Sequence, residues 1–440
     1  MRGVIRYNDT VERAAKVLAE VSNRLLVVVD SEDRVIGLVT EGDLRNAQPL
    51  DRLDSVMKKD FRFVTEGYDP SALSQIFDQR VHSVPVLSKD GRLLEVIDHS
   101  SIRGFGVRGD LFYSRTPARV SLAGGGTDFT NFFTNHGGGG LCVAVNRYAY
   151  ATLRVRQDKT ITVVSKDTGE QFKVDSLWAI DTVAKLGIVV MAIKHVSPSF
   201  GFDLLISSEF PVGSGLGGSA AVVSSVLGVL LEAAGMSLKK EEIARAAFEI
   251  ERVHLAIAGG WQDQYSTVFG GVCSLSYSEK AVVAIPVKID PAQRMAFESS
   301  AVMVHTGGAH HGQAVQVSNA RPKTYNPEKV AEGLELVVQA RLSFQRGSMR
   351  DLGKILSRSW EMKKAGNSIV SNPQIDSIYK DVISDGAFGG KLLGTGGGGY
   401  LFFLVPVEKK QTMINRMTGQ GLDAFSISID EFGLQAWEVR

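Results

Sequence analysis

The sequence of 440 residues lacks the features that mark membrane, secreted and nucleic-acid-binding proteins. No uninterrupted apolar run reaches about 18 residues, the length that a membrane-spanning helix needs. The N-terminal stretch lacks the apolar core of a secretory signal. The formal net charge is only +1, which gives no reason to expect nucleic acid or an anionic membrane as a partner. We therefore expect a cytoplasmic protein that binds neither of these partners.

Cysteine is scarce, and its placement excludes a zinc or disulfide framework. Cys142 and Cys273 stand far apart in the sequence, in apolar surroundings, and belong to no CxxC or Cys/His pattern. We expect two reduced thiols in a hydrophobic core. Hydrophobic and charged contents of 44% and 22% are ordinary for a soluble globular protein. A chain of this length is expected to fold into two or three domains.

Residues 1–105 contain a weak internal repeat. In the first copy a helical pattern, VERAAKVLAEV, precedes the strand LLVVV, the turn SEDR, the strand VIGLVT and a short helix that begins at Glu41. The second copy repeats this order, with a helix near 70–79, the strands SVPVL and LLEVI around the turn SKDGR, and a last helix near Ser100. The repeat predicts two similar small units in tandem.

The pattern of predicted helices and strands changes after this repeat. Three glycines within six residues interrupt the apolar pattern, so 106–112 is predicted to be a linker. Beyond it, longer strands such as YAYATLRVR alternate with helices such as SAAVVSSVLGVLLEAAG. We expect 113–440 to form one catalytic unit with two lobes, 113–290 and 291–440.

The segment PVGSGLGGSAA, residues 211–221, is the strongest single feature of the sequence. An apolar strand leads into it, and a helix rich in Ala, Val and Leu leads out, with Ser219 at the helix start. Four glycines let a ligand approach main-chain N–H groups closely, and the positive end of the helix favours phosphates. A plain strand-to-helix turn is the alternative, but such a turn needs only one or two glycines.

Two better-known phosphate motifs do not explain this segment. The spacing G-x-G-x-x-G occurs at 213–218 and again at 394–399, but a dinucleotide fold also needs a strand–helix–strand unit with an acid closing the second strand. Two helical stretches follow Ser219 in a row, and Glu232 lies within the first of them. The P-loop sequence GxxxxGK[ST] is absent.

Two further segments carry acids and a base suited to phosphoryl transfer. In FEIERVHLAIAGGWQDQYSTVFGG, Glu251 lies near a helix end and Asp263 follows a Gly-Gly break. Asp263 is suited to orient or deprotonate an acceptor hydroxyl, and Glu251 with Ser219 to bind Mg²⁺, although a helix cap is the alternative for Asp263. In RTPARVSLAGGGTDF, Arg119 and Asp128 suit phosphate and sugar hydroxyls respectively, with a surface salt bridge as the alternative.

These segments, in this order, resemble the GHMP kinase superfamily over essentially all of 113–440. PARVSLAGGGTDF is similar to its first motif, PVGSGLGGSAA to its ATP-phosphate loop and LLGTGGGGYL to its third motif. AGGGTDF, GGWQDQYSTVFGG and SWEMKKAGNSIVSNPQID most resemble the D-glycero-D-manno-heptose 7-phosphate kinase branch, with fucokinase nearby. The resemblance implies an α+β fold, with a left-handed β-α-β unit in the first lobe and a ferredoxin-like second lobe.

The resemblance also implies roles for individual residues, with MgATP as the phosphate donor and a sugar or sugar phosphate as the acceptor. Asp263 matches the catalytic aspartate, and Arg119 matches the basic residue that supports it and the transferred phosphoryl group. Ser219 and Glu251 match the Mg²⁺ ligands. The implied ATP-binding residues are Pro211, Gly213, Ser214, Gly215, Leu216, Gly217, Gly218 and Ser219. The implied substrate-binding residues are Gly125, Gly126, Thr127, Asp128, Gly396, Gly397 and Gly398.

Residues 1–105 resemble a pair of CBS domains. VIGLVTEGDLR matches a pattern whose threonine and aspartate contact the phosphate and ribose of an adenosine-type nucleotide, and here Thr40 and Asp43 hold these positions. The second copy replaces the glycine, threonine and aspartate of the pattern and is not expected to bind nucleotide. The resemblance implies either an adenine nucleotide effector at the first copy or a module for dimerisation and packing. We expect a homodimer.

The acceptor is the least determined part of this interpretation. His310 and His311, in VHTGGAHHGQAVQ, stand where heptose kinases carry an arginine-containing stretch. The first expectation is phosphorylation of D-glycero-D-manno-heptose 7-phosphate at its anomeric hydroxyl, giving the 1,7-bisphosphate for nucleotide-activated heptose synthesis. The alternatives are another sugar such as fucose or a hexose, and a non-catalytic nucleotide-sensing protein on a kinase scaffold.

Overall fold

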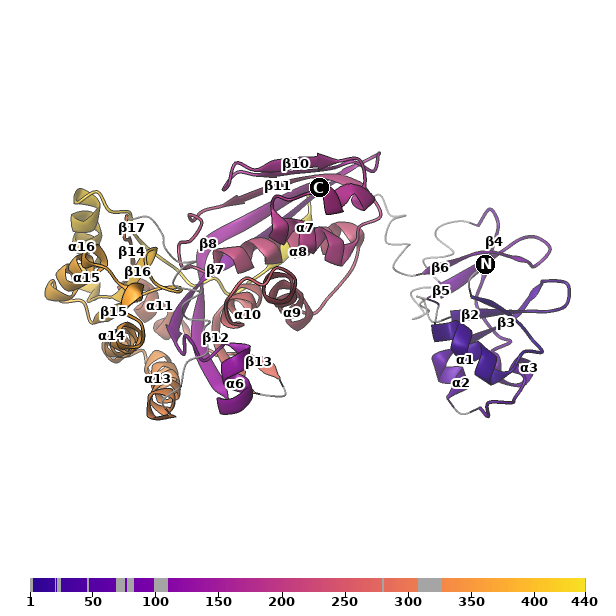
Figure 1. Ribbon diagram of the computed structural model, residues 1–440, viewed down its shortest axis with the longest axis horizontal. Coiled ribbons are helices and arrows are strands. Elements are labelled where there is room, and N and C mark those ends of the chain that lie inside the picture. The colour runs from indigo at the N-terminus through magenta and orange to yellow at the C-terminus, as the bar shows by residue number, and fades with distance from the viewer. Residues whose placement is uncertain are drawn as a thin grey trace. The chain divides into compact units, whose positions relative to one another are not determined.

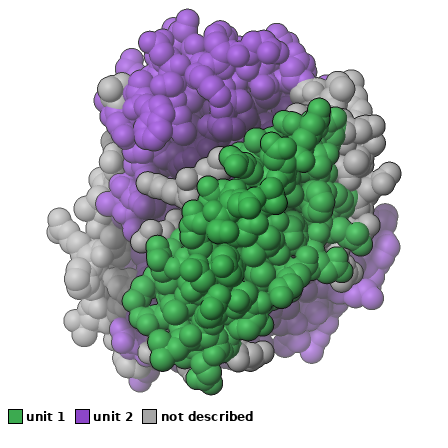
Figure 2. Space-filling view, turned by 90° about the vertical axis from the view of Figure 1, so that its right-hand side faces the viewer, with its two compact units in different colours: residues 1–108 green, residues 109–440 purple. Residues whose placement is uncertain are grey.

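The computed structural model divides the chain into two compact units, residues 1–108 and 109–440 (Figure 2). The helices predicted near 70–79 and Ser100, and the His310–His311 loop, lie outside the residues that the structure describes. The described residues are 3–19, 21, 25–45, 47–68, 76, 83–98, 110–278, 281–307 and 327–439.

The first unit contains two small sheets that repeat the same strand pairing. In the sheet β1-β2-β3 the first pair is parallel and the second antiparallel, and β4-β5-β6 pairs in the same way. The repeated pattern in the sequence predicts this duplication. The bounds are β1 Val4–Arg6, α1 Val11–Ala19, β2 Leu25–Val29, β3 Val35–Thr40, α2 Glu41–Leu44, α3 Leu53–Val56, β4 Val64–Thr65, β5 Ser83–Leu87 and β6 Leu93–Asp98.

Apolar periodicity explains how the first unit holds together. Val11, Ala14 and Leu18 recur at helical spacing and place one face of α1 in the core, while every residue of β2 is buried. Across the two copies, buried residues of β2 and β3 pack against Leu93 of β6. The two copies therefore share a core as well as a pattern.

A large twisted sheet forms the first lobe of the second unit (Figure 1). Its order is β10-β9-β11-β8-β12-β13, with β7 paired to β8 and β18 paired to β7. The strands are β7 Leu111–Ala123, β8 Gly138–Arg156, β9 Ile161–Ser165, β10 Gln171–Val174, β11 Gly201–Ser208, β12 Val272–Tyr277, β13 Val282–Pro286 and β18 Gln435–Glu438. The helices are α6 Thr130–His136, the 3₁₀-helix η1 Leu177–Thr182, α7 Gly187–Val196, α8 Gly218–Ala234, α9 Lys240–Phe248, the π-helix η2 Glu249–His254 and α10 Gln262–Phe269.

Two boundaries differ from the predicted ones. Strand β7 already begins at Leu111, inside the predicted linker, because Leu111 pairs with Arg154 of β8. Strand β18 returns from the end of the chain to pair with β7, so the predicted second lobe, 291–440, also contributes to the first. Local sequence patterns do not show such a return, because the pairing joins segments more than 300 residues apart.

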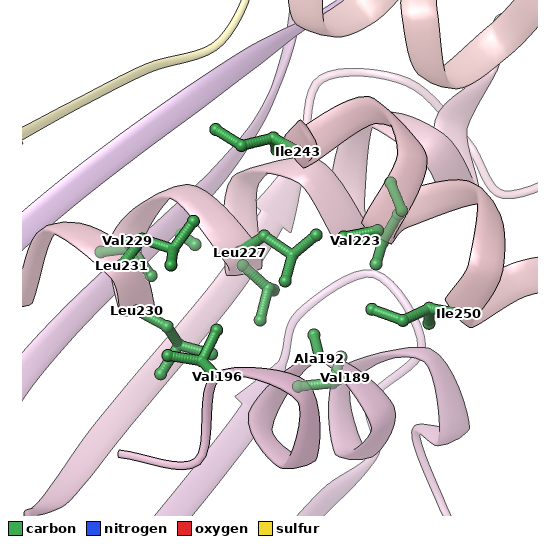
Figure 3. Close-up of a cluster of buried hydrophobic side chains, with 14 of the residues drawn as sticks. Val189, Ala192, Val196, Val223, Leu227, Val229, Leu230, Leu231, Ile243 and Ile250 are labelled. Carbon is green, nitrogen blue, oxygen red and sulfur yellow. The ribbon is translucent and has the colours of Figure 1, made fainter. Parts of the chain in front are cut away.

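Helix α8 is apolar on almost every side and is covered accordingly. Figure 3 shows Val196 of α7 close to Leu230 of α8, while Ile243 of α9 and Ile250 of η2 contribute to the same cluster. A helix that is hydrophobic all round needs such cover from several neighbours. Helix α7 lies in the connection between the parallel strands β9 and β11, which is the expected β-α-β unit. Its left-handedness stays a prediction.

The second lobe has the predicted ferredoxin-like arrangement. Its antiparallel sheet has the order β15-β16-β14-β17, and helices connect β14 to β15 and β16 to β17. The α+β fold with two lobes is thereby confirmed. The strands are β14 Ala301–His305, β15 Gly389–Leu392, β16 Tyr400–Leu404 and β17 Ala424–Ser426. The helices are α11 Pro291–Ser300, α13 Pro327–Gln345, α14 Met349–Gly366, the 3₁₀-helix η3 Ser368–Val370, α15 Pro373–Ser384 and α16 Val407–Gly419.

One hydrophobic cluster joins the two lobes. Val120 of β7 and Leu141 of β8 belong to the same buried cluster as Phe297 of α11 and Phe402 of β16. Because this core is continuous, it fixes the position of groups that the two lobes present to a shared cleft. Cys142 and Cys273 are buried free thiols, as expected. No helix in the described part of the chain has the length and apolarity to cross a membrane.

Candidate active site

A cavity of about 970 Å³ brings together the three glycine-rich segments. It is lined by Gly124 to Asp128, by most of the 211–219 loop, and by Gly394 and Thr395. These segments lie in β7 and the turn after it, before α8, and between β15 and β16. The fold therefore places the expected substrate, nucleotide and third motifs in one cavity within the second unit.

The 211–219 loop combines three left-handed glycine conformations with a helix start. Gly213, Gly215 and Gly217 have φ angles of 79°, 80° and 74°, a region that favours glycine. A Cβ at Gly215 would lie 2.9 Å from the carbonyl oxygen of Leu393, so the third glycine segment packs directly against this loop. Helix α8 begins at Gly218, and the first N–H groups of a helix attract anions.

One predicted loop residue does not face the cavity. The side chain of Leu216 is 1% exposed and belongs to the core that joins the lobes. Its carbonyl oxygen accepts a 3.0 Å hydrogen bond from the backbone N–H of Arg119. Leu216 thus anchors the loop to β7, whereas Ser219, in the first turn of α8, is exposed to the cavity.

Arg119 and Asp263 form a buried ion pair at the cavity wall. The Arg119 guanidinium donates hydrogen bonds of 2.9 and 2.6 Å to Asp263 Oδ1, and a third of 2.6 Å to the Gly215 carbonyl oxygen. Asp263 Oδ2 accepts no hydrogen bond from the described residues. Arg119 is only 2% exposed, which excludes a surface salt bridge. Asp263 lies in the first turn of α10, and its carboxylate pairs with Arg119 instead of capping the helix.

Asp128 presents a second buried carboxylate to the cavity. It is 2% exposed, and its oxygens accept hydrogen bonds from the backbone N–H groups of Gly126 at 3.2 Å and Gln262 at 3.4 Å. A Cβ at Gly260 would overlap this carboxylate, which explains the Gly-Gly break before Asp263. Burial, followed by repulsion from Asp263, raises the pKa of Asp128 to about 6.

The hydroxyl of Thr127, the residue before Asp128, stabilises the local backbone. It lies 2.9 Å from the Gly124 carbonyl oxygen and 2.8 Å from that of Gly139. These bonds fix the turn after β7 against the start of β8. Thr127 also lines the cavity, as do Gly125 and Gly126, so the first group of predicted substrate-binding residues is assembled.

The predicted metal ligands are neighbours, although only one of them lines the cavity. Glu251, in the π-helical turn η2, is 0% exposed, and one of its oxygens accepts a hydrogen bond from the Gln264 amide. Its Oε1 has no hydrogen-bond partner among the described residues and lies 3.9 Å from the Arg252 guanidinium. Burial raises the pKa of Glu251, and the charge of Arg252 and the nearby Ser219 hydroxyl counteract this. The described residues hold no cluster of three or more His, Cys, Asp or Glu side chains suited to a metal.

The third glycine segment is placed differently from the prediction. Gly397 donates a 2.8 Å backbone hydrogen bond to the Val370 carbonyl oxygen, and a Cβ at Gly396 would lie 2.7 Å from Val370 Cβ. Gly396, Gly397 and Gly398 are buried and do not line the cavity. These glycines therefore let η3 approach the segment closely, and the residues next to them in sequence, Gly394 and Thr395, face the cavity instead.

Two lysines in the cavity wall were not among the predicted residues. Lys363 of α14 donates a 2.7 Å hydrogen bond to the Gly394 carbonyl oxygen, and Lys391 of β15 is only 6% exposed. Burial, then the charge of Lys391, lowers the pKa of Lys363 to about 7. Burial, with the charge of Arg119, lowers the pKa of Lys391 to about 8. For Lys391, the only feature of the sequence that could have indicated a buried site is its position between glycine and leucine in GGKLL.

In the first unit, Thr40 and Asp43 contact each other. The Asp43 carboxylate accepts hydrogen bonds from the Thr40 backbone N–H at 2.8 Å and from the Thr40 hydroxyl at 2.6 Å. Lys58 lies 3.2 Å from the other carboxylate oxygen. This arrangement is a capping box at the start of α2. The nucleotide-binding role of the two residues stays a prediction.

Comparisons with known proteins agree with this architecture. Residues 184–271 match the GHMP kinases N terminal domain, residues 340–421 match the GHMP kinases C terminal domain, and residues 4–49 and 53–107 each match the CBS domain. The paired CBS match confirms the interpretation of the repeat. Each half of the second unit is thus similar to a separate kinase domain.

Individual relatives give the same result. The chain is 32% identical to D-glycero-alpha-D-manno-heptose 7-phosphate kinase from Campylobacter jejuni, over 74% of this chain and 98% of that protein. It is 26% identical to L-fucokinase/L-fucose-1-P guanylyltransferase from Bacteroides fragilis, over 75% of this chain but only 38% of that protein. A crystal structure of a putative sugar kinase from Campylobacter jejuni superposes with a TM-score of 0.63 at 29% identity, covering 75% of this chain and 99% of that one. The chain therefore belongs to the GHMP kinase family, as an ATP-dependent sugar kinase with CBS domains at its N-terminus.

Proposed function

We propose that the protein transfers the γ-phosphoryl group of MgATP to the anomeric hydroxyl of D-glycero-D-manno-heptose 7-phosphate. The buried Arg119–Asp263 pair, beside the glycine loop and within one cavity, is the observation that carries the proposed chemistry. The proposed acceptor rests on the similarity to the heptose 7-phosphate kinase over 98% of that protein. The product would be the 1,7-bisphosphate, an intermediate toward nucleotide-activated heptose.

In this proposal ATP lies along the 211–219 loop. Its phosphates meet the first N–H groups of α8 and the glycines of the loop. The cavity continues to the turn between β9 and β10 and to the start of α7, where Leu186 and Ile188 line it. These apolar side chains suit the base of the nucleotide, since ligand cavities typically combine apolar walls with a few polar groups.

The Arg119–Asp263 pair then acts on the acceptor hydroxyl and on the transferred phosphoryl group. Both guanidinium bonds to the carboxylate go to Oδ1, which leaves Oδ2 to accept the hydroxyl proton. The acceptor oxygen forms its bond to phosphorus while the bond to the ADP oxygen breaks. Arg119 is held in place by Gly215 and offsets the negative charge of the phosphoryl group during transfer.

Ser219 and Glu251 fit a magnesium ion. A fully buried carboxylate oxygen without a hydrogen-bond donor, next to a serine hydroxyl, matches the oxygen ligands that Mg²⁺ prefers. The ion supplies charge neutralisation of the nucleotide phosphates when bound. Gln264 orients the Glu251 carboxylate through its amide, and the nearby Arg252 limits the net negative charge of this pocket.

Asp128 is proposed to position the sugar. Its carboxylate is held by two backbone N–H groups at the acceptor side of Asp263, where it can accept hydrogen bonds from sugar hydroxyls. With a pKa of about 6 it is mostly ionised at pH 7, the form that accepts such bonds.

The experiment that tests this proposal is an acceptor panel. ADP formation by the full-length protein with MgATP is measured against heptose 7-phosphate, unphosphorylated heptose, L-fucose and hexoses. We expect turnover with heptose 7-phosphate and its loss in Asp263→Asn, while binding of ADP is unchanged. Turnover confined to an unphosphorylated sugar would overturn the proposed acceptor and retain the mechanism.

An unphosphorylated sugar such as L-fucose is the second candidate acceptor. The similarity to L-fucokinase/L-fucose-1-P guanylyltransferase favours it, although the chain spans only 38% of that protein. His310 and His311 stand where heptose kinases carry an arginine-containing stretch, and this difference also favours an acceptor without a phosphate. The non-catalytic alternative loses support, because the five expected active-site residues assemble in and around one cavity.

We also propose that the CBS pair binds an adenine nucleotide, that the protein forms a homodimer and that it works in the cytoplasm, where ATP is available. CBS domains match both halves of the first unit. Light scattering of the full-length chain tests the dimer, and kinase activity with and without AMP tests the effector. A monomer, or rates that do not respond to AMP, would contradict the respective proposal.

A further inference from the structure

Lys363 and Lys391 line the cavity from the second lobe. They come from α14 and β15 of the second lobe, whereas the glycine loop and Arg119 belong to the first. Figure 1 shows α14 beside the sheet that contains β15. The second lobe thus contributes two cations to a cavity whose nucleotide-binding loop lies in the first.

The positive charge of these lysines is not balanced by the protein. Lys363 donates to a neutral acceptor, the Gly394 carbonyl oxygen. The side chain of Lys391 is 94% buried and has no hydrogen bond or ion pair with the described residues. Asp263, a carboxylate of the cavity wall, is already paired with Arg119. Burial without a carboxylate partner favours the neutral form of each amine, and an anion bound between them would stabilise both ammonium forms.

The surroundings of Lys391 include a residue that is linked to Asp128, the carboxylate proposed to position the sugar. Cys142 of β8 lies near Lys391, but burial raises the pKa of its thiol, so at pH 7 the thiol is neutral and does not balance the charge of the lysine. The Cys142 sulfur lies 3.6 Å from Gln262 Oε1, and the Gln262 backbone N–H bonds the Asp128 carboxylate. Cys142, near Lys391, is thus linked through Gln262 to the carboxylate proposed to position the sugar, whereas the N–H groups of α8 are proposed to bind the nucleotide phosphates.

We propose that Lys363 and Lys391 form a phosphate-binding subsite that holds the phosphate already carried by the sugar acceptor. This assignment rests on the proposed function, because it requires a sugar phosphate as the acceptor. It explains why the cavity contains two lysines in addition to Arg119 and Arg252. Ammonium groups on two different elements recognise a phosphate dianion by charge and hydrogen bonding together.

Kinetics of lysine variants test the assignment in the full-length enzyme. In Lys391→Met and Lys363→Met we expect KM for heptose 7-phosphate to rise roughly 10- to 100-fold, the usual effect of losing a charge-assisted hydrogen bond. KM for ATP stays unchanged. Lys364→Met is the matched control, because Lys364 is adjacent on α14, pairs with Glu361 and does not line the cavity. Equal losses of kcat with phosphorylated and unphosphorylated sugars would overturn the assignment, since the lysines would then act on the transferred group.

A binding experiment separates this subsite from the proposed substrate. Inorganic phosphate is titrated calorimetrically into the protein saturated with Mg²⁺ and a non-hydrolysable ATP analogue, which occupies all three nucleotide phosphate positions. We expect phosphate to bind to the wild type and to Lys364→Met, and to bind at least about tenfold more weakly to Lys391→Met. This result, together with failure of heptose 7-phosphate as acceptor, would retain the subsite and remove only the sugar. Equal phosphate binding by Lys391→Met and the wild type would overturn the subsite.

Discussion

Replacement of Lys391 by methionine is expected to stabilise the protein while weakening acceptor binding. Lys391 is 6% exposed, and its pKa falls from the usual 10.5 to about 8 because burial disfavours the charged form. A pKa difference of about 2.5 corresponds to about 3 to 4 kcal/mol, at roughly 1.4 kcal/mol per unit. Methionine has a similar length and carries no charge, so it removes this penalty.

The sign of the pH dependence follows from proton linkage. The folded state binds Lys391's proton less tightly than the unfolded state, so the penalty is fully present below about pH 8 and disappears as the pH approaches 10.5. At pH 7 we expect Lys391→Met to raise the free energy of unfolding by up to about 3 to 4 kcal/mol. The gain over the wild type should shrink above pH 8.

The assay is guanidinium unfolding at pH 7, followed by tryptophan fluorescence. All four tryptophans lie in the second unit, so the signal reports unfolding of the kinase part in the full-length chain. Lys364→Met serves as the control and is expected to change stability by less than about 1 kcal/mol. A loss of more than about 1 kcal/mol in Lys391→Met would refute the reasoning, because it would mean that the protein itself stabilises the ammonium group.

Four further predictions concern the two units. Asp263→Asn should lower kcat by about 10²- to 10⁴-fold without changing ADP affinity, as measured by ADP release and calorimetry. Because Asp128 has a pKa of about 6 and acts as a carboxylate, kcat/KM for the acceptor should fall about tenfold per pH unit below 6 and be level above it, and Asp128→Asn should abolish that limb. Gly215→Ala should raise KM for ATP and destabilise the fold by about 1–3 kcal/mol, because φ is 80° and the new Cβ meets the Leu393 carbonyl. Asp43→Ala should remove any AMP response and lower the stability of the first unit by about 1 kcal/mol through loss of the α2 cap, as followed by circular dichroism.

The sequence predicted those features that depend only on neighbouring residues. Glycines with positive φ, an apolar helix that starts beside them and the recurring apolar positions of α1 are local features, and the structure contains all three. The pairing of Arg119 with Asp263 joins positions 144 residues apart. Only the family resemblance indicated it, because no periodicity links such distant residues.

Features that depend on tertiary packing were missed or misplaced. In the sequence Lys391 is an ordinary strand lysine, and its burial arises only when β15 packs beside α14 and at the cavity wall. Gly396 to Gly398 belong to the expected motif but serve the close approach of Val370, which sequence spacing does not show. The complete burial of Glu251 in the π-helical turn could not be predicted from the sequence either, because it depends on the helices that pack around this turn.

The most direct test of the central claim is phosphorus NMR of the reaction product. The full-length protein is incubated with MgATP and D-glycero-D-manno-heptose 7-phosphate, and the spectrum is recorded as ATP is consumed. The account predicts a new resonance from an anomeric phosphate, coupled to the anomeric proton and equal in intensity to the retained 7-phosphate signal. A spectrum in which heptose 7-phosphate is unchanged, while an unphosphorylated sugar under the same conditions gains a phosphate, would contradict it.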